Sequence, residues 1–243
     1  MTSGLNGADL RGDYQWLDWG RDYYAAVSFN DAPDNRRLMI AWMNNWEYAN
    51  HIPTTPWRSP MSLAREISLQ TIDGKLCLVQ QPAGDLAALA GPDPFCLSET
   101  TIHDGVQVLA GAAGTVQRID VTFTPGSAEE FGLILRGDGV TGTTGTRVGI
   151  RPGEAQLFVD RRESGRTDFH ESFPSIDTAP VRATSGSYHL SIFVDRCSVE
   201  VFAQGGQVTM TELIFPAETS TSLAVYATGG TATITSLQVT QLA

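Results

Sequence analysis

The chain has 243 residues, of which 42% are hydrophobic, and a formal net charge of −11. This length suffices for one large domain or two smaller ones, and the apolar content excludes a disordered chain. The negative charge repels phosphate backbones and anionic lipid headgroups, so we expect neither nucleic acid nor a membrane surface as a partner. The sequence contains no apolar run of about 18 residues, and residues 1–11 lack the charged and then apolar pattern of a signal peptide.

The three cysteines and four histidines are widely separated. No two cysteines form a C-x-x-C pair, and no two histidines have a spacing that would place both on one face of an element. We therefore predict no disulfide framework, no metal site and no cofactor.

Most of the chain is predicted to form short strands. Apolar and β-branched residues alternate with polar ones, and clusters of Gly, Pro, Asn and Asp interrupt them. The pair Asp73-Gly74 tolerates the positive φ of a tight turn, so we expect a hairpin between 63–72 and 76–80. The one helix-like segment is 83–90, which a Gly-Pro pair terminates, and it predicts a short connector.

The composition changes beyond this connector. All five tryptophans precede it, and the later half is rich in Thr, Val, Gly and Ile, which suits a sandwich of two antiparallel sheets. Two further hairpins are predicted there from Gly-Gly pairs, at 205–206 and 229–230. The sequence thus predicts an all-β chain with a domain boundary at the connector.

Four segments match the motifs of one enzyme family in order. Residues 17–25 (LDWGRDYYA) are similar to a D-x-G-x-D-F-Y-A strand, and residues 38–46 (LMIAWMNNW) to the I-x-W-x-x-x-W strand that follows it. Residues 57–66 (WRSPMSLARE) are similar to the segment that ends the propeller in that family. Residues 193–202 (FVDRCSVEVF) match F-V-D-x-S-S-V-E-V-F of its sandwich, with Cys197 where serine is usual. The chain therefore resembles the β-fructosidases of glycoside hydrolase family 32.

This resemblance implies a fold. Residues 1–75 would form the last blade region of an incomplete five-bladed β-propeller, 76–92 a connector, and 93–243 a two-sheet antiparallel β-sandwich. A single blade needs neighbours on both sides, so we expect the chain to bind a missing N-terminal propeller chain or to self-associate. Members of the family are often secreted, and the localisation of this chain stays open.

The chemistry of the family needs two carboxyl groups, an aspartate nucleophile and a glutamate acid/base, about 5 to 5.5 Å apart. The family carries them in a W-M-N-D-P-N-G segment and an E-C pair, with an R-D-P aspartate between, and none of these motifs occurs here. Residues 42–45 (WMNN) repeat part of the first motif but place Asn45 where the aspartate belongs. An amide does not attack an anomeric carbon as a carboxylate does, so we predict no catalytic residue.

The resemblance also implies part of a sugar-binding site. Asp22 would hydrogen-bond hydroxyls of a fructosyl unit, Tyr23 beside it would help to shape the site, and Trp42 would form its aromatic wall. A sugar presents an apolar C–H face that packs on an indole ring and hydroxyls that pair with a carboxylate, which suits these residue types. The implied ligand is a weakly bound fructan or sucrose-type carbohydrate.

Several of these residues also have a purely structural explanation. Without the resemblance, Asp22 would be predicted as a turn residue that closes a strand. Trp46 and Trp57 are predicted to be structural. The basic pair Arg161-Arg162 is predicted to lie in a solvated loop.

Three hypotheses about function follow from the sequence. In the first, the chain is the C-terminal portion of a β-fructosidase acting on levan, inulin or sucrose, and it is inactive alone because both catalytic carboxylates are absent. In the second, it is a stand-alone fructan-binding protein. In the third, it is a module whose sandwich stabilises an oligomer.

Overall fold

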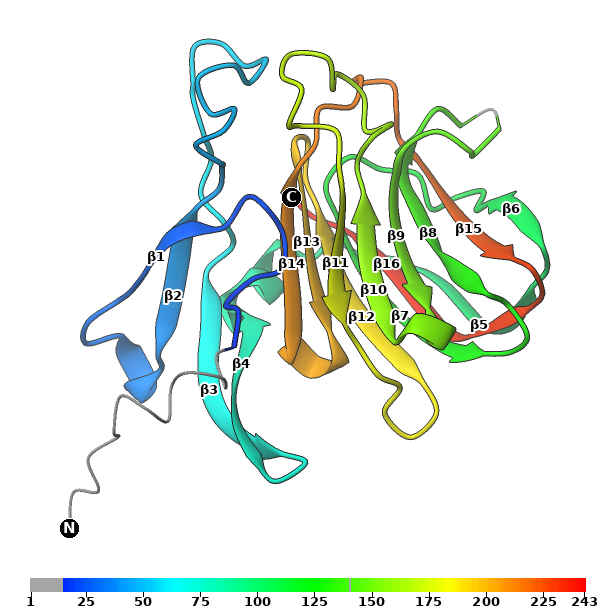
Figure 1. The fold of residues 1–243 in the computed structure, drawn as a ribbon, viewed down its shortest axis with the longest axis horizontal. Helices are drawn as coiled ribbons and strands as arrows, with labels where there is room; N and C mark the ends of the chain where they lie inside the picture. Colours follow the sequence, from blue (N-terminus) through cyan, green and yellow to red (C-terminus); the bar gives the residue numbers. More distant parts are fainter. Residues whose placement is uncertain (1–14, 140) are drawn as a thin grey trace.

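The computed structural model describes residues 15–139 and 141–243, which form two β-domains packed side by side (Figure 1). A four-stranded antiparallel sheet forms the first domain, and two six-stranded antiparallel sheets form the second. Short 3₁₀ helices join some of the strands, namely η1 (Pro33–Asn35), η2 (Gly84–Leu89), η3 (Pro152–Glu154) and η4 (Gln204–Gly206).

The first domain is a meander in the strand order of one propeller blade. Its strands are β1 (Tyr24–Ser28), β2 (Leu38–Trp42), β3 (Arg65–Ile72) and β4 (Lys75–Pro82). Asp73 and Gly74 both have positive φ and close the predicted hairpin between β3 and β4. Because β4 runs to Pro82, the first sheet extends into the range 76–92 predicted as the connector. The predicted helix at 83–90 is present as η2.

The second domain is a sandwich of two six-stranded sheets. One sheet has the order β14-β13-β12-β7-β16-β5 and the other β11-β10-β9-β8-β15-β6. The strands are β5 (Phe95–Ile102), β6 (Gly105–Val108), β7 (Gln117–Pro125), β8 (Glu130–Gly137), β9 (Thr146–Arg151), β10 (Gln156–Asp160), β11 (Ile176–Pro180), β12 (Tyr188–Val194), β13 (Ser198–Ala203), β14 (Val208–Leu213), β15 (Ser222–Thr228) and β16 (Ala232–Gln241). Alternate side chains of both sheets, such as Val121 and Leu133, form one shared apolar core.

The two predicted Gly-Gly hairpins have different outcomes. Gly205 and Gly206 have positive φ and turn β13 back onto β14, as predicted. Gly229 and Gly230 also have positive φ, but they connect β15 to β16, which belong to different sheets. The hairpin predicted there is wrong, because the glycines permit a reversal of the chain while packing across the sandwich decides the pairing.

The first domain contacts the sandwich along β14, the sandwich strand nearest the blade in Figure 1. The segment before β1 runs beside it, and the backbone amides of Trp19 and Asp22 donate to the carbonyl oxygens of Thr209 (2.9 Å) and Thr211 (3.1 Å). At Gly20 an added Cβ would lie 2.2 Å from the carbonyl oxygen of Thr211. This approach of two backbones therefore requires glycine.

An apolar cluster closes another part of the same interface. The loop after β2 meets the loop between β10 and β11, where the rings of His51 and His170 lie 5.2 Å apart (Figure 1). The buried members of the cluster come from both domains and are Met43, Tyr48, Ile52, Phe173, Leu213 and Phe215. Because burial of this surface needs both domains, it favours their folding as one unit.

Candidate functional site

Asp22 lies in the interface between the domains, and its side chain is fully buried. Its Oδ2 accepts hydrogen bonds from Nη1 of Arg161 (2.6 Å) and from the amide of Leu213 (2.8 Å). Its Oδ1 accepts one from the hydroxyl of Tyr48 (2.7 Å). Both oxygens are thus engaged by protein groups. The predicted contact of Asp22 with sugar hydroxyls stays a prediction that this geometry does not favour.

Arg161 is the cation at the centre of this cluster. Its side chain is fully buried, so the prediction that it lies in a solvated loop is wrong. Besides Asp22, its guanidinium lies 3.0 Å from Oε2 of Glu212 and donates to the hydroxyl of Tyr48 (2.9 Å). Burial alone would lower the pKa of Arg161. The carboxylates of Glu212 and Asp22 raise it by more, so the pKa of Arg161 lies above its ordinary value. Burial raises the pKa of Glu212 well above its usual range, although Arg161 opposes this.

A second buried cluster surrounds Arg65 of β3. Its guanidinium donates to Oδ2 of Asp18 (2.9 Å) and to Oε2 of Glu200 (3.0 Å). Burial raises the pKa of Glu200, and the nearby Arg65 lowers it. Two of the sequence motifs, 17–25 and 193–202, thus place their carboxylates against arginines across the interface. In the described residues these motifs join the blade to the sandwich.

Tyr23 lies behind this second cluster. The guanidinium carbon of Arg65 is 3.9 Å from the centre of its ring, a cation–π contact. Burial raises the pKa of the Tyr23 hydroxyl to about 12. Within the described part of the chain that hydroxyl is buried without a hydrogen-bond partner. The role predicted for Tyr23 in shaping a sugar site stays a prediction.

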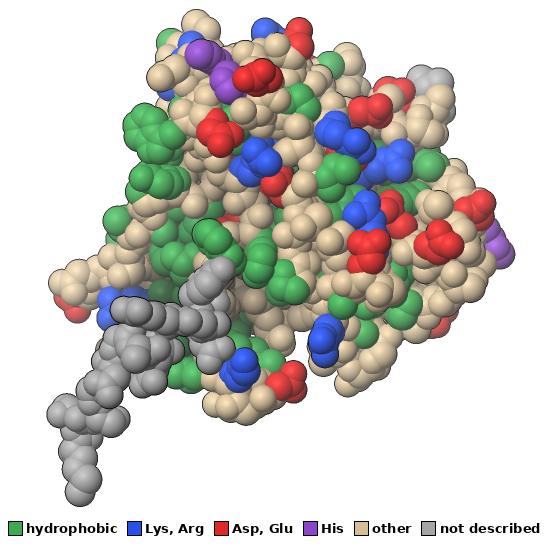
Figure 2. Space-filling model, in the orientation of Figure 1, with side chains coloured by type: hydrophobic (Ala, Val, Ile, Leu, Met, Phe, Trp, Pro, Cys, Tyr) green, Lys and Arg blue, Asp and Glu red, His purple; other side chains and the backbone are tan. Residues whose placement is uncertain are grey.

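Trp42 is half-buried and belongs to a group of three rings at the surface, which we call the aromatic cluster: Tyr24, Trp42 and Trp46. The ring centre of Trp42 lies 5.9 Å from that of Tyr24 and 5.1 Å from that of Trp46. Tyr24 is 51% exposed and Trp46 67%. The structural role predicted for Trp46 stays a prediction. Figure 2 shows hydrophobic side chains gathered on the blade side of the molecule. Such rings offer the apolar faces on which a sugar packs.

The sequence contained a signal for Tyr24 that the motif comparison did not use. Successive side chains of a strand point to opposite faces, so Tyr23 and Tyr24 diverge. Tyr24 is the register partner of Trp42 in the β1–β2 pair, whereas Tyr23 contacts Arg65. Asn45 lies in the turn after β2, and its Nδ2 donates to the carbonyl oxygen of Arg21 (3.0 Å).

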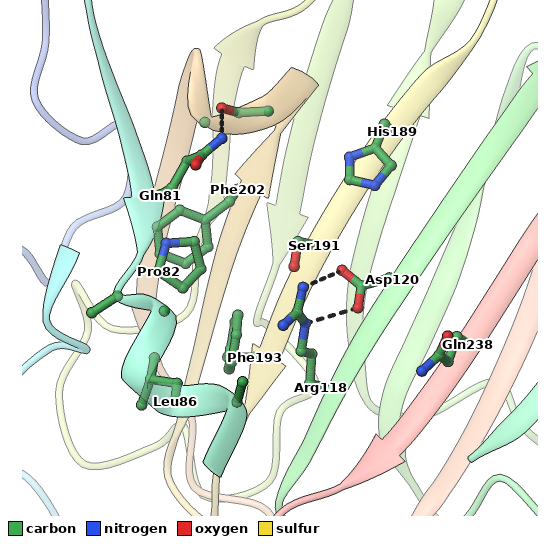
Figure 3. A pocket seen from close by; sticks show the side chains of 15 residues that line it. Gln81, Pro82, Leu86, Arg118, Asp120, His189, Ser191, Phe193, Phe202 and Gln238 are labelled. Carbon is green, nitrogen blue, oxygen red and sulfur yellow. Dashed lines mark hydrogen bonds and ion pairs between the residues drawn. The ribbon is translucent and has the colours of Figure 1, made fainter. Parts of the chain in front are cut away.

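A separate cavity of about 570 Å³ lies between η2 and the outer face of the β7–β12 pair (Figure 3). Arg118 and Asp120 of β7 form an ion pair there, with Nε 2.8 Å from Oδ2. Ser191 of β12 and Gln238 of β16 flank Asp120 in register on either side. No predicted site residue lines this cavity. Substitutions in it are therefore a suitable control for substitutions in the aromatic cluster.

Within residues 15–139 and 141–243, no group of three or more His, Cys, Asp or Glu side chains could hold a metal ion. No helix in this part of the chain is long and apolar enough to span a membrane.

The blade and the sandwich, joined by buried ion pairs, have the architecture of a β-propeller and β-sandwich protein. Residues 96–241 match the model described as glycosyl hydrolases family 32 C terminal. Residues 4–82 match the model of the family 32 N-terminal domain. The chain belongs to glycosyl hydrolase family 32. This confirms the resemblance and the predicted fold of an incomplete five-bladed β-propeller followed by a β-sandwich.

Curated relatives are considerably longer than this chain. It is 42% identical over 230 residues to a levanase of Bacillus subtilis (strain 168), a match that covers 92% of this chain and 33% of the relative. It is 38% identical to an extracellular exo-inulinase of Aspergillus niger, with 88% of this chain and 40% of the relative covered. The chain thus spans between a third and two fifths of the length of these two relatives.

Solved structures show the same fold. The crystal structure of exo-inulinase from Aspergillus awamori superposes with a TM-score of 0.88 at 36% identity, over 94% of this chain and 44% of that one. The β-fructofuranosidase of Schwanniomyces occidentalis, complexed with fructosyl-erythritol, gives a TM-score of 0.80 at 21% identity. That match covers 94% of this chain and 49% of the other and supports the fold alone.

Proposed function

We propose that this chain is the C-terminal portion of an enzyme that hydrolyses β-fructofuranosidic bonds in fructans or sucrose. In that enzyme it supplies the sandwich, one propeller blade and the aromatic wall around Trp42, and the N-terminal part of the propeller supplies the nucleophile and the acid/base. The similarity to a levanase and an exo-inulinase supports this function. The aromatic cluster is the observation that carries it.

The aromatic cluster would hold a fructosyl unit by its C–H face and keep water from that side of the sugar. The ion-pair clusters around Arg65 and Arg161 fix the blade against the sandwich, and so fix the position of Trp42. Neither the nucleophile motif nor the acid/base motif occurs in the sequence. The chain alone therefore lacks a group to attack the anomeric carbon and a group to protonate the leaving oxygen.

Co-expression with the N-terminal part of the Bacillus subtilis levanase tests this function. The purified complex is expected to release fructose from levan, inulin or sucrose, and the chain alone is expected to release none. Fructose is measured by an enzymatic assay, and light scattering establishes whether the complex has formed. A folded, stoichiometric complex without fructose release would contradict the proposal, and so would turnover by the chain alone.

Replacing Trp42 with alanine in that complex is expected to lower kcat/KM for fructose release about tenfold. Loss of one ring–sugar contact removes roughly 1–2 kcal/mol of binding that persists into the transition state. Steady-state kinetics with sucrose measures the effect. Trp16→Ala is the control, because Trp16 presents an indole ring at the surface (56% exposed) but lies outside the aromatic cluster. Asp120→Asn controls for binding in the cavity of Figure 3. Equal losses of kcat/KM in all three variants would show that Trp42 is not part of the sugar-binding site.

A further inference from the structure

The junction of the two domains contains a second cavity, of about 500 Å³, which shares no lining residue with the aromatic cluster. The loop after β2 contributes Trp57, and the segment after β14 contributes Phe215. Three arginines from different parts of the sandwich complete the lining: Arg136 of β8, Arg166 of the loop after β10, and Arg196 of the β12–β13 turn. We call this cavity the arginine pocket.

The charge of the arginine pocket is opposite to that of the whole chain. The chain has 16 Lys and Arg against 27 Asp and Glu, and three of its cations line this one cavity. A single carboxylate, that of Glu218, lines it as well, and the Asp195 carboxylate acts on Arg136 from outside the lining, so positive charge still exceeds negative charge here. Arg166 and Arg196 are exposed and Arg136 is buried. Like charges that line one cavity repel one another, and an anion bound among them relieves that repulsion.

Arg136 is buried in the wall of the pocket and 5% exposed. Its guanidinium donates to backbone carbonyl oxygens, among them those of Ser220 (2.7 Å) and Asp195 (3.1 Å). Within the described residues it forms no ion pair with a carboxylate, so its guanidinium is held by carbonyl oxygens rather than by direct contact with an anion. Burial lowers the pKa of Arg136, the Asp195 carboxylate opposes this, and the Arg196 guanidinium lowers the pKa again.

Arg166 and Arg196 have guanidinium groups that are open to a ligand. Among residues 15–139 and 141–243, neither side chain donates a hydrogen bond or forms an ion pair. Trp57 is 44% exposed at the same cavity and offers an apolar ring beside these charges. The pocket thus combines free forked donors, an excess of positive charge and an indole face.

We propose that the arginine pocket binds a sugar phosphate, with the phosphate among Arg136, Arg166 and Arg196 and the sugar ring against Trp57. Arginine pairs bidentately with phosphate, and the three terminal oxygens of a phosphate monoester accept hydrogen bonds from several guanidinium groups at once. A monoester carries close to two negative charges at pH 7, which suits a lining in which positive charge is in excess. The C–H face of the sugar suits the indole ring. The site is independent of the proposed hydrolysis of fructans.

Isothermal titration calorimetry of the full chain tests the proposal with three probes: fructose 6-phosphate, inorganic phosphate and fructose. Fructose 6-phosphate is expected to bind most tightly, and inorganic phosphate more weakly because it has no ring to pack on Trp57. Fructose is expected to give no binding that depends on the arginines. Affinity for both phosphates is expected to fall as salt concentration rises.

Variants assign the binding to the pocket. Arg166→Gln and Arg196→Gln are each expected to lower the affinity for both phosphates about tenfold, because each removes a charged donor. Glu218→Gln is expected to tighten binding severalfold by removing the one negative charge of the lining. Arg182→Gln, at an exposed arginine outside the pocket, is the matched control and is expected to change nothing. Arg136 is left intact because it anchors backbone carbonyls.

Two results would overturn the proposal. The first is the absence of phosphate binding, or binding that the Arg166 and Arg196 variants leave unchanged. The second concerns the ligand: equal affinity for fructose 6-phosphate and inorganic phosphate, unaffected by Trp57→Ala, would exclude the sugar phosphate in favour of free phosphate. Neither result depends on fructose release.

Discussion

Replacing Arg161 with methionine is expected to lower the free energy of unfolding by about 3–5 kcal/mol. The side chains of Arg161, Asp22 and Glu212 are all fully buried, so the substitution leaves two carboxylates in the interface without their cation. Neutral hydrogen bonds, such as the one from Tyr48 to Asp22, offset much less of their desolvation than the Arg161 cation does. Urea denaturation followed by circular dichroism measures the loss.

The neighbouring residue provides the control. Arg162 forms an ion pair with Asp160 and its side chain is 57% exposed, so Arg162→Met is expected to cost less than about 1 kcal/mol. The difference in the free energy of unfolding between the Arg161 and Arg162 variants is expected to become smaller at lower pH. Burial raises the pKa of Glu212 in the folded protein, so its protonation favours folding, and that contribution is lost as the pH rises through the raised pKa. Equal losses for the two variants would show that the buried pair does not join the domains.

Replacing Gly20 with alanine is expected to lower the free energy of unfolding by about 3 kcal/mol. The new Cβ would lie 2.2 Å from the carbonyl oxygen and 2.4 Å from the amide nitrogen of Thr211. Both contacts are with backbone, which cannot rotate away, so the segment before β1 must separate from β14. That movement also disturbs the hydrogen bond from the Asp22 amide to Thr211. Thermal and urea unfolding measure the change.

Gly84→Ala is the matched control for this substitution. No atom lies within 4 Å of a Cβ added at Gly84, and its backbone lies outside the left-handed region. The variant is expected to unfold within about 0.5 kcal/mol of the original chain. If Gly20→Ala were equally stable, the close approach of the two backbones would not contribute to the interface.

Local pattern predicted the strands and turns because alternation and turn residues act over a few positions. The hairpins at 73–74 and 205–206 follow from it. The error at 229–230 arose where the sheet of each strand depends on distant partners, since β15 pairs with β8 and β16 with β7. A turn signal contains no information about such partners.

The interface clusters could not be predicted from local pattern either. Asp22 and Arg161 are separated by 139 positions, and Arg65 and Glu200 by 135. In the sequence Arg161 stands beside a second arginine and resembles a solvated run, and only the tertiary fold distinguishes the two. The family resemblance identified Trp42, but the neighbouring ring that faces it belongs to Tyr24 rather than Tyr23.

The contact between the first domain and β14 also bears on solubility. β14 is the outermost strand of its sheet, and such a strand offers unpaired backbone groups to which strands of other molecules add. In this chain the amides of Trp19 and Asp22 occupy two of its carbonyl oxygens, and Gly20 lets the covering backbone lie close. The segment before β1 therefore covers this edge and hinders its pairing with strands of other molecules. A sandwich produced without it would carry an open sheet edge, however well its own core were packed.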